Sequence, residues 1–244
     1  MGETTKISWC NHTWNPWLGC TKVSPGCRSC YAERIETRAR RDFSIVRRAK
    51  NWTNPFKWQK EASEAGEHRF VFTCSMSDFF HEDADEWRDE AWGIIRMCPN
   101  LTFQILTKRP ERIKQCLPGD WFPGGYPNVW LGASVELPLY VSTRIYHLLQ
   151  TPAPVHFLSC EPLLGPLDLS GYLGPTAISW VIVGGESGPS FREMDISWAT
   201  SLKDQCEKAD VPFWGKQRAG YSSELPLLID GREWKARPLP GGVA

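Results

Sequence analysis

From about residue 70 onward, short apolar runs alternate with amphipathic stretches, and this alternation determines the expected fold class. Apolar runs bounded by polar residues are typical of strands that are buried on both faces, as in parallel sheets. Between these runs, apolar residues recur at helical spacing. The expected strands are RFVFTCSM at 69–76, TFQILTK at 102–108, VWLGASVE at 129–136, VHFLSCE at 155–161, WVIVGGE at 180–186 and VPFWGKQ at 211–217. This order predicts an α/β chain with a parallel sheet.

The number of strand–helix units limits the architecture further. Six units and a first strand expected at 5–9 (TKISW) are too few for the eight units of a complete TIM barrel. We therefore predict a partial, partly open parallel (β/α)6-type barrel of the TIM-barrel kind. No shift in composition divides the 244 residues, so we expect one domain over 1–244, with a C-terminal extension at about 218–244.

Polar residues stand where the expected strands end. Glu136, Glu161 and Glu186 follow one another at intervals of 25 residues, so each unit returns a carboxylate to one edge of the sheet. The carboxyl ends of the strands form the active face of such folds. Salt-bridged loop residues are the alternative, but all six strands end in this way. The candidate site residues on this rim are Ser77, Asp78, Lys108, Arg109, Ser134, Glu136, Glu161 and Glu186.

Charge and cysteine usage narrow the class of protein. Lys plus Arg and Asp plus Glu both number 28, a formal net charge of zero, so no global charge predicts wrapping of nucleic acid or binding to an anionic membrane. The chain has no apolar run long enough for a membrane span and no secretory signal pattern at its start. Nine cysteines, an odd number, disfavour a disulfide framework. We expect a cytoplasmic protein without a membrane partner.

Three of the nine cysteines lie in one loop after the first expected strand. Cys20, Cys27 and Cys30 have the spacing C-x6-C-x2-C, and thiolates so spaced can bind one metal centre. Three thiolates suit a [4Fe–4S] cluster that keeps one iron open. A structural zinc site would need a fourth ligand, for which Cys10 and His12 are candidates. A loop without metal is the third alternative.

A basic stretch follows the cysteine loop. We expect a helix over residues 31–50, in which seven Lys or Arg outnumber three Asp or Glu. Arg34, Arg38 and Arg41 would share one face of this helix. A solvated surface is the favoured interpretation, and phosphate contact is the alternative.

Several blocks of the sequence resemble a known family. They are TWNPWLGCTKVSPGCRSCYAE, SMSDFF, FQILTKRPERI, LGASVE, FLSCEPLLGPLDL, WVIVGGESGP and PFWGKQ, and they extend over roughly residues 7–217. Together they resemble a phage-associated three-cysteine family of unknown function, which is similar to the radical S-adenosylmethionine superfamily. That superfamily usually has three residues between its first two cysteines, whereas this chain has six.

The resemblance implies a cofactor and a reaction class. Cys20, Cys27 and Cys30 would ligate a [4Fe–4S] cluster, and its fourth iron would bind S-adenosylmethionine. An electron from an external reductant would cleave S-adenosylmethionine to a 5′-deoxyadenosyl radical that acts on an unidentified substrate, with a nucleobase or nucleotide as the candidate. Tyr31 would lie against the adenine, and the rim residues would hold the polar groups of the cofactor. Two alternatives stay open: a zinc-stabilised module that binds nucleic acid or a partner, and a non-radical iron–sulfur protein for electron transfer or repair.

Overall fold

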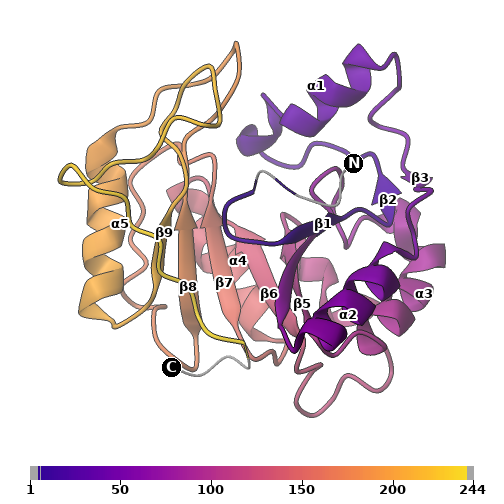
Figure 1. Ribbon diagram of the computed structural model, residues 1–244. Coiled ribbons are helices and arrows are strands. Elements are labelled where there is room, and N and C mark those ends of the chain that lie inside the picture. The colour runs from indigo at the N-terminus through magenta and orange to yellow at the C-terminus, as the bar shows by residue number, and fades with distance from the viewer. Residues whose placement is uncertain (1–4, 6, 241–244) are drawn as a thin grey trace.

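The computed structural model describes residue 5 and residues 7–240. Its main element is a sheet of seven parallel strands in the order β1-β4-β5-β6-β7-β8-β9, curled into half a barrel (Figure 1). The strands are β1 (His12–Trp14), β4 (Arg69–Thr73), β5 (Leu101–Thr107), β6 (Val129–Ser134), β7 (His156–Cys160), β8 (Ile178–Val183) and β9 (Phe213–Gly215). This arrangement confirms the predicted partial, partly open parallel barrel. Two short strands, β2 (Trp17–Leu18) and β3 (Arg47–Arg48), pair antiparallel beside it.

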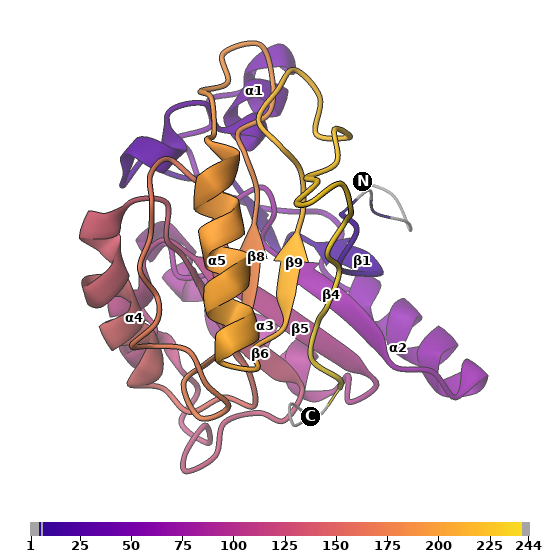
Figure 2. The same ribbon diagram turned by 90° about the vertical axis from the view of Figure 1, so that its left-hand side faces the viewer.

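Helices cover the outer face of the curled sheet (Figures 1 and 2). They are α2 (Asn54–Ala65), α3 (Asp85–Arg96), α4 (Val141–Leu149) and α5 (Ile196–Lys208), and α1 (Tyr31–Arg38) lies above the sheet. The last three of the covering helices lie between expected strands, where the sequence shows apolar residues at helical spacing. The start of α5 is fixed by Asp195, whose carboxylate accepts a hydrogen bond of 2.8 Å from the Ser197 amide. Among the described residues, no helix is long and apolar enough to cross a membrane.

Two expected elements near the N-terminus were wrong. Residues 8 and 9 form a turn instead of the strand expected at 5–9, and the first strand begins at His12; Lys6 lies outside the described residues. The helix expected over 31–50 ends at Arg38. Arg40 has a left-handed φ of 56°, and Arg41 and Arg47 both fold back to pair with the buried Glu36. The chain therefore turns around this carboxylate instead of continuing the helix.

Apolar side chains form two layers, one on each face of the sheet. The layer between sheet and helices is the larger and includes Trp14 and Trp17. The concave face carries a smaller aromatic layer to which Trp9, Trp130 and Trp180 contribute. The Trp130 and Trp180 ring centroids lie 5.8 Å apart at 77°, an edge-to-face packing that aromatic rings favour. The inside of the half-barrel is thus filled with rings below the rim.

The C-terminal extension packs on the sheet. The Gly215 amide donates to the Trp234 carbonyl at 2.8 Å, and the Ala236 amide donates to the Phe213 carbonyl at 3.0 Å, so this segment runs antiparallel beside β9. Further on, the Arg237 guanidinium lies 3.8 Å from the centroid of the Phe70 ring in β4. The extension therefore links the last strand to an early one. That residues 1–244 form a single domain stays a prediction.

Candidate functional site

The cysteine loop lies over the carboxyl ends of the strands, at the upper end of the molecule in Figure 1. Arg192, in the segment after β8, donates from Nη2 to the Pro25 carbonyl at 3.0 Å. Ser29 Oγ donates to the Ser190 carbonyl at 3.2 Å. Gly26 lies so close to Glu136 that an added Cβ would be 2.8 Å from the carboxylate Oε1. The loop is therefore in contact with the ends of β6 and β8.

A glycine and short backbone contacts fix where this loop begins. Gly19 has a φ of 103°, and a Cβ there would lie 2.4 Å from the Ile45 carbonyl oxygen, so only glycine fits without a shift of the backbone. The Cys20 amide donates to the Phe43 carbonyl at 2.8 Å. Ser77 Oγ donates to the Trp17 carbonyl at 3.1 Å. These contacts fix the position of Cys20 beside the end of β4.

The three thiols of the loop are free and partly exposed. Burial, aided by the nearby Asp78 charge, raises the pKa of the Cys20 thiol to about 12. Among residues 5 and 7–240, no group of three His, Cys, Asp or Glu side chains is gathered closely enough to hold a metal ion. The donor chemistry nevertheless fits an iron–sulfur cluster, which is bound by cysteine thiolates.

The two candidates for a fourth zinc ligand have other contacts. The His12 ring stacks on Trp58 of α2, with centroids 4.4 Å apart and planes at 4°. The Cys10 thiol donates to the Ile7 carbonyl at 3.7 Å, and burial raises its pKa to about 12. The described contacts therefore engage both side chains in packing.

Asp78 and Arg109 tie the ends of β4 and β5 to the cysteine loop. The buried Asp78 carboxylate accepts hydrogen bonds from Thr107 Oγ1 at 2.7 Å and from the Lys108 amide at 2.9 Å. The buried Arg109 guanidinium lies 3.7 Å from this carboxylate. It donates to Thr21 Oγ1 at 2.6 Å and to Cys20 Sγ at 3.5 Å. The positive charge of Arg109 lowers the pKa of the Cys20 thiol, but burial outweighs this effect and the net shift is upward.

The three glutamates spaced by 25 residues meet at the rim, and each is paired with a cation. The pairs are Glu136 with Arg144 at 2.7 Å, Glu161 with Lys216 at 2.7 Å and Glu186 with Arg192 at 2.6 Å. Burial raises the pKa of Glu186, but the hydrogen bonds and charge of Arg192 outweigh burial, so the net shift is downward. The rim is thus a ring of ion pairs instead of a set of free carboxylates.

The remaining candidates also lie at this edge. Lys108 Nζ donates to Ser134 Oγ at 3.3 Å, which joins β5 to β6. The Tyr31 hydroxyl donates to the Ser75 carbonyl and so holds the start of α1 over the end of β4. Gln217 donates to Glu161 Oε1 at 2.7 Å, while its own Oε1 is buried without a partner among the described residues. A buried amide oxygen without a partner is a place where a ligand or water can donate a hydrogen bond.

Sequence reasoning missed the partners of these side chains. Thr21, Arg144 and Arg192 have no place in the strand pattern, yet they anchor Arg109, Glu136 and Glu186. The one signal for Arg144 was its position between the expected strands at 129–136 and 155–161, where apolar residues recur at helical spacing. Nothing in the sequence pattern indicated Thr21 or Arg192.

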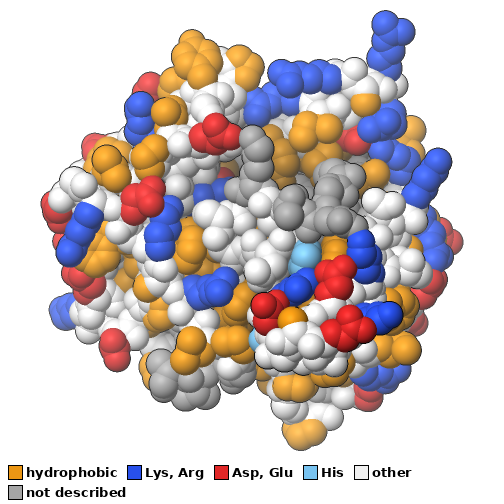
Figure 3. All heavy atoms as spheres, viewed as in Figure 1, with side chains coloured by type: hydrophobic (Ala, Val, Ile, Leu, Met, Phe, Trp, Pro, Cys, Tyr) orange, Lys and Arg blue, Asp and Glu red, His pale blue; other side chains and the backbone are white. Residues whose placement is uncertain are grey.

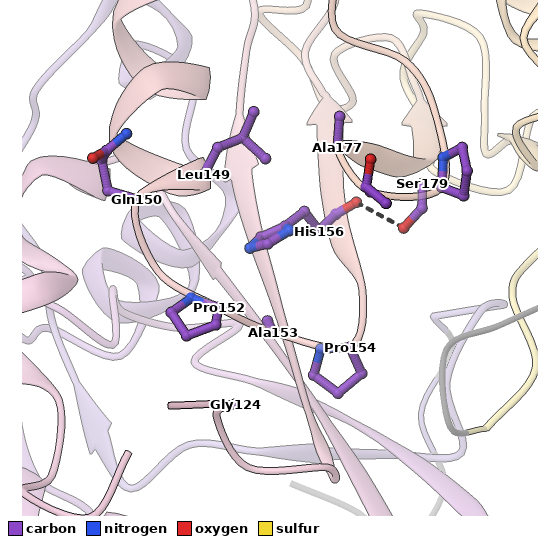
Figure 4. A pocket seen from close by; sticks show the side chains of 11 residues that line it. Gly124, Leu149, Gln150, Pro152, Ala153, Pro154, His156, Ala177 and Ser179 are labelled. Atoms are coloured by element: carbon purple, nitrogen blue, oxygen red, sulfur yellow. Dashed lines mark hydrogen bonds between the residues drawn. The ribbon is translucent and has the colours of Figure 1, made fainter. Parts of the chain in front are cut away.

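A hollow of about 460 Å³ lies at the opposite edge of the sheet. His156 and Ser179, near the amino ends of β7 and β8, line it, and Ser179 Oγ donates to the His156 carbonyl at 3.4 Å (Figure 4). Active faces of parallel α/β folds are at the carboxyl ends of the strands. This hollow is therefore separate from the candidate site.

Solved structures with a similar fold include variants of spore photoproduct lyase. One, with bound AdoMet and dinucleoside spore photoproduct, matches with a TM-score of 0.50 at 13% identity over 85% of this chain. A second variant of the same enzyme matches with the same TM-score, identity and coverage. This chain covers 64% of the length of each of those structures. At this identity the likeness concerns the fold alone, and it agrees with the partial parallel barrel described above.

A comparison with curated proteins finds no match. A comparison with protein families does find one, over residues 4–238, which is nearly the whole chain and includes the cysteine loop and every candidate residue of the rim. The chain therefore belongs to the family described as "Protein of unknown function (DUF5131)".

Proposed function

We propose that this chain is an iron–sulfur enzyme of the radical S-adenosylmethionine kind, with an unidentified substrate derived from nucleic acid. The observation that carries the proposal is the position of Cys20, Cys27 and Cys30, on one loop in contact with the carboxyl edge of a curled parallel sheet. The fold likeness to a lyase that binds AdoMet and a dinucleoside photoproduct supports it. The association with phages and the cytoplasmic location stay predictions.

Cys20, Cys27 and Cys30 would hold the [4Fe–4S] cluster. Such a cluster would supply one-electron chemistry for the reductive cleavage of S-adenosylmethionine to a 5′-deoxyadenosyl radical. An external one-electron reductant is therefore a required partner. The chain itself supplies Arg109, which donates a hydrogen bond to Cys20 and places a positive charge beside the thiolates.

The rim residues would bind S-adenosylmethionine. Carboxylates suit its ammonium group, and Lys and Arg suit its carboxylate. Glu161, Lys216 and Gln217 are the best placed. Lys216 and Gln217, after β9, both donate to Glu161 at the end of β7, and the buried Gln217 Oε1 has no partner among the described residues. The proposed set is completed by Tyr31, Ser77, Asp78, Lys108, Arg109, Ser134, Glu136 and Glu186.

Metal analysis combined with a cleavage assay tests the proposal. The protein is purified without oxygen, and iron, sulfide and zinc are measured for the wild type, Cys27→Ala and Cys206→Ala. Cys206 is a buried thiol of α5, so its replacement controls for the loss of a cysteine as such. We expect about four iron and four sulfide per chain in the wild type and in Cys206→Ala, and a large loss of both in Cys27→Ala.

The cleavage assay then separates the remaining alternatives. With dithionite and S-adenosylmethionine, the wild type is expected to release 5′-deoxyadenosine, and Cys27→Ala is not. Stoichiometric zinc in protein from iron-replete cells would favour the zinc-stabilised binding module. An intact cluster that never consumes S-adenosylmethionine would favour the non-radical iron–sulfur protein.

A further inference from the structure

Unpaired arginines gather beside the cysteine loop although the chain has no net charge. Arg28, Arg38 and Arg40 are exposed, and no hydrogen bond or ion pair of their side chains occurs within the described residues. Other cations of the same segment are paired: Lys22 with Glu33, and Arg41 and Arg47 with Glu36. Figure 3 shows Lys and Arg side chains gathered at this upper end, with few acidic ones among them.

Arg34 continues this set toward the rim. It lies one helical turn before Arg38 in α1, so both side chains share one face. Its Nη1 is buried and has no hydrogen-bond partner in the part of the chain that the structure describes. The guanidinium lies against Gly188, where an added Cβ would be 1.4 Å from Nη1. A cation without a counter-ion, held against a glycine, is suited to an anion that approaches along this backbone.

An aromatic pair, the exposed Tyr221 and the half-buried Phe191, adjoins Gly188. The Gly188 amide donates to the Gly220 carbonyl at 2.9 Å, and Tyr221 follows with 77% of its surface exposed. The Tyr221 ring meets Phe191 at 5.2 Å and 75°. The face of α1 with Arg34 and Arg38, the two glycines and the aromatic pair therefore form a continuous path, called here the Arg34–Tyr221 path.

We propose that the Arg34–Tyr221 path binds single-stranded nucleic acid, with phosphates on the arginines and a base stacked on Tyr221. The assignment rests on the proposed function, for which it names the substrate class. The planar guanidinium group of arginine can donate two hydrogen bonds to the oxygens of one phosphate. Cations next to exposed aromatic rings are typical of sites that bind single-stranded nucleic acid. A duplex has its bases stacked inside and offers none to Tyr221. An acidic peptide would use the arginines but not the ring.

Fluorescence anisotropy with a labelled single-stranded 12-mer, on the full-length protein purified without oxygen, tests this assignment. The variants are Arg34→Gln/Arg38→Gln and Tyr221→Ala, and the matched control is Lys60→Gln/Lys208→Gln, two exposed cations of α2 and α5. For the arginine pair we expect the salt dependence, the slope of log K against log salt, to become shallower by about 1.4, since each phosphate contact in a single strand contributes about 0.7. For Tyr221→Ala we expect affinity to fall about fivefold or more. The control is expected to bind as the wild type does.

DNA and RNA 12-mers are tested separately to show which type of single strand binds, and tight binding of either supports the assignment. Equal affinity for poly-glutamate would overturn it, as would tighter binding of a duplex than of a single strand. The outcome is independent of the cluster: a protein that cleaves S-adenosylmethionine but does not bind the 12-mer refutes the assignment and leaves the proposed function standing. A protein that binds the 12-mer but holds no iron supports the assignment and refutes the proposed function.

Discussion

The ion pair between Glu136 and Arg144 offers a stability test of the rim. Glu136 Oε2 accepts from Arg144 Nη1 at 2.7 Å, and both side chains are buried. Arg144 also donates to the Ser134 carbonyl at 2.7 Å. Arg144→Met removes the positive charge and leaves the carboxylate buried without its partner. Breaking a buried pair in this way costs about 3–5 kcal/mol of unfolding free energy.

The expected change in melting temperature follows from the length of the chain. A protein of 244 residues has an unfolding entropy near 0.5 kcal/mol/K, so each kcal/mol lost lowers Tm by about 2 °C. Arg144→Met should therefore melt about 6–10 °C below the wild type in thermal unfolding followed by circular dichroism. Glu136→Gln/Arg144→Met removes both charges, and we expect it to regain more than half of this loss.

Arg96→Met is the matched control, because Arg96 and Asp120 pair on the surface with side chains 60% and 50% exposed. Exposed pairs contribute about 1 kcal/mol or less, so we expect Tm to fall by about 2 °C at most. The reasoning is refuted if Arg144→Met melts as close to the wild type as Arg96→Met does. It is also refuted if the double variant is no more stable than Arg144→Met.

Three further predictions concern the barrel, the cluster and pH. Gly132→Ala would place a Cβ 2.4 Å from the buried Phe157 ring, so thermal unfolding should show a loss of about 1–3 kcal/mol that Phe157→Leu in the same chain partly restores. Arg109→Met removes a donor and a positive charge from Cys20, so a redox titration should show the cluster potential at more negative values; Arg109→Lys should lie between that variant and the wild type. Burial lowers the pKa of His156, so the unfolded chain takes up a proton there before the folded chain does. Unfolding free energy should therefore fall as pH drops below about 6.5, and less steeply in His156→Asn.

The sheet could be predicted from the sequence because its strands are buried on both faces. β6 and β8 are nearly continuous apolar runs, and a run of that kind can be recognised without any tertiary information. β1 was missed because it has only three residues and follows a turn. The long basic helix was wrong because its continuation depended on Glu36, whose pairing with Arg41 and Arg47 is a tertiary contact.

The positions of the rim residues could be predicted from the sequence, but their ion pairs could not. The 25-residue interval placed Glu136, Glu161 and Glu186 at one edge, since parallel strands bring their carboxyl ends together. Their cations come from a helix, a later strand end and a loop, and no spacing rule connects such segments. The six residues between Cys20 and Cys27 include Pro25 and Gly26, which contact Arg192 and Glu136. The longer gap therefore carries the contacts that fix the loop on the rim.

Electron paramagnetic resonance of the reduced protein, titrated with S-adenosylmethionine, tests whether the chain holds a [4Fe–4S] cluster with an open iron. Three thiolates leave one iron of a [4Fe–4S] cluster open, so the signal of the reduced cluster should change as S-adenosylmethionine is added and should be absent in Cys27→Ala. Cys206→Ala should respond as the wild type does. A cluster signal that S-adenosylmethionine leaves unchanged would show that no iron is open to it, and protein from iron-replete cells that holds only zinc would show that the loop is a zinc site.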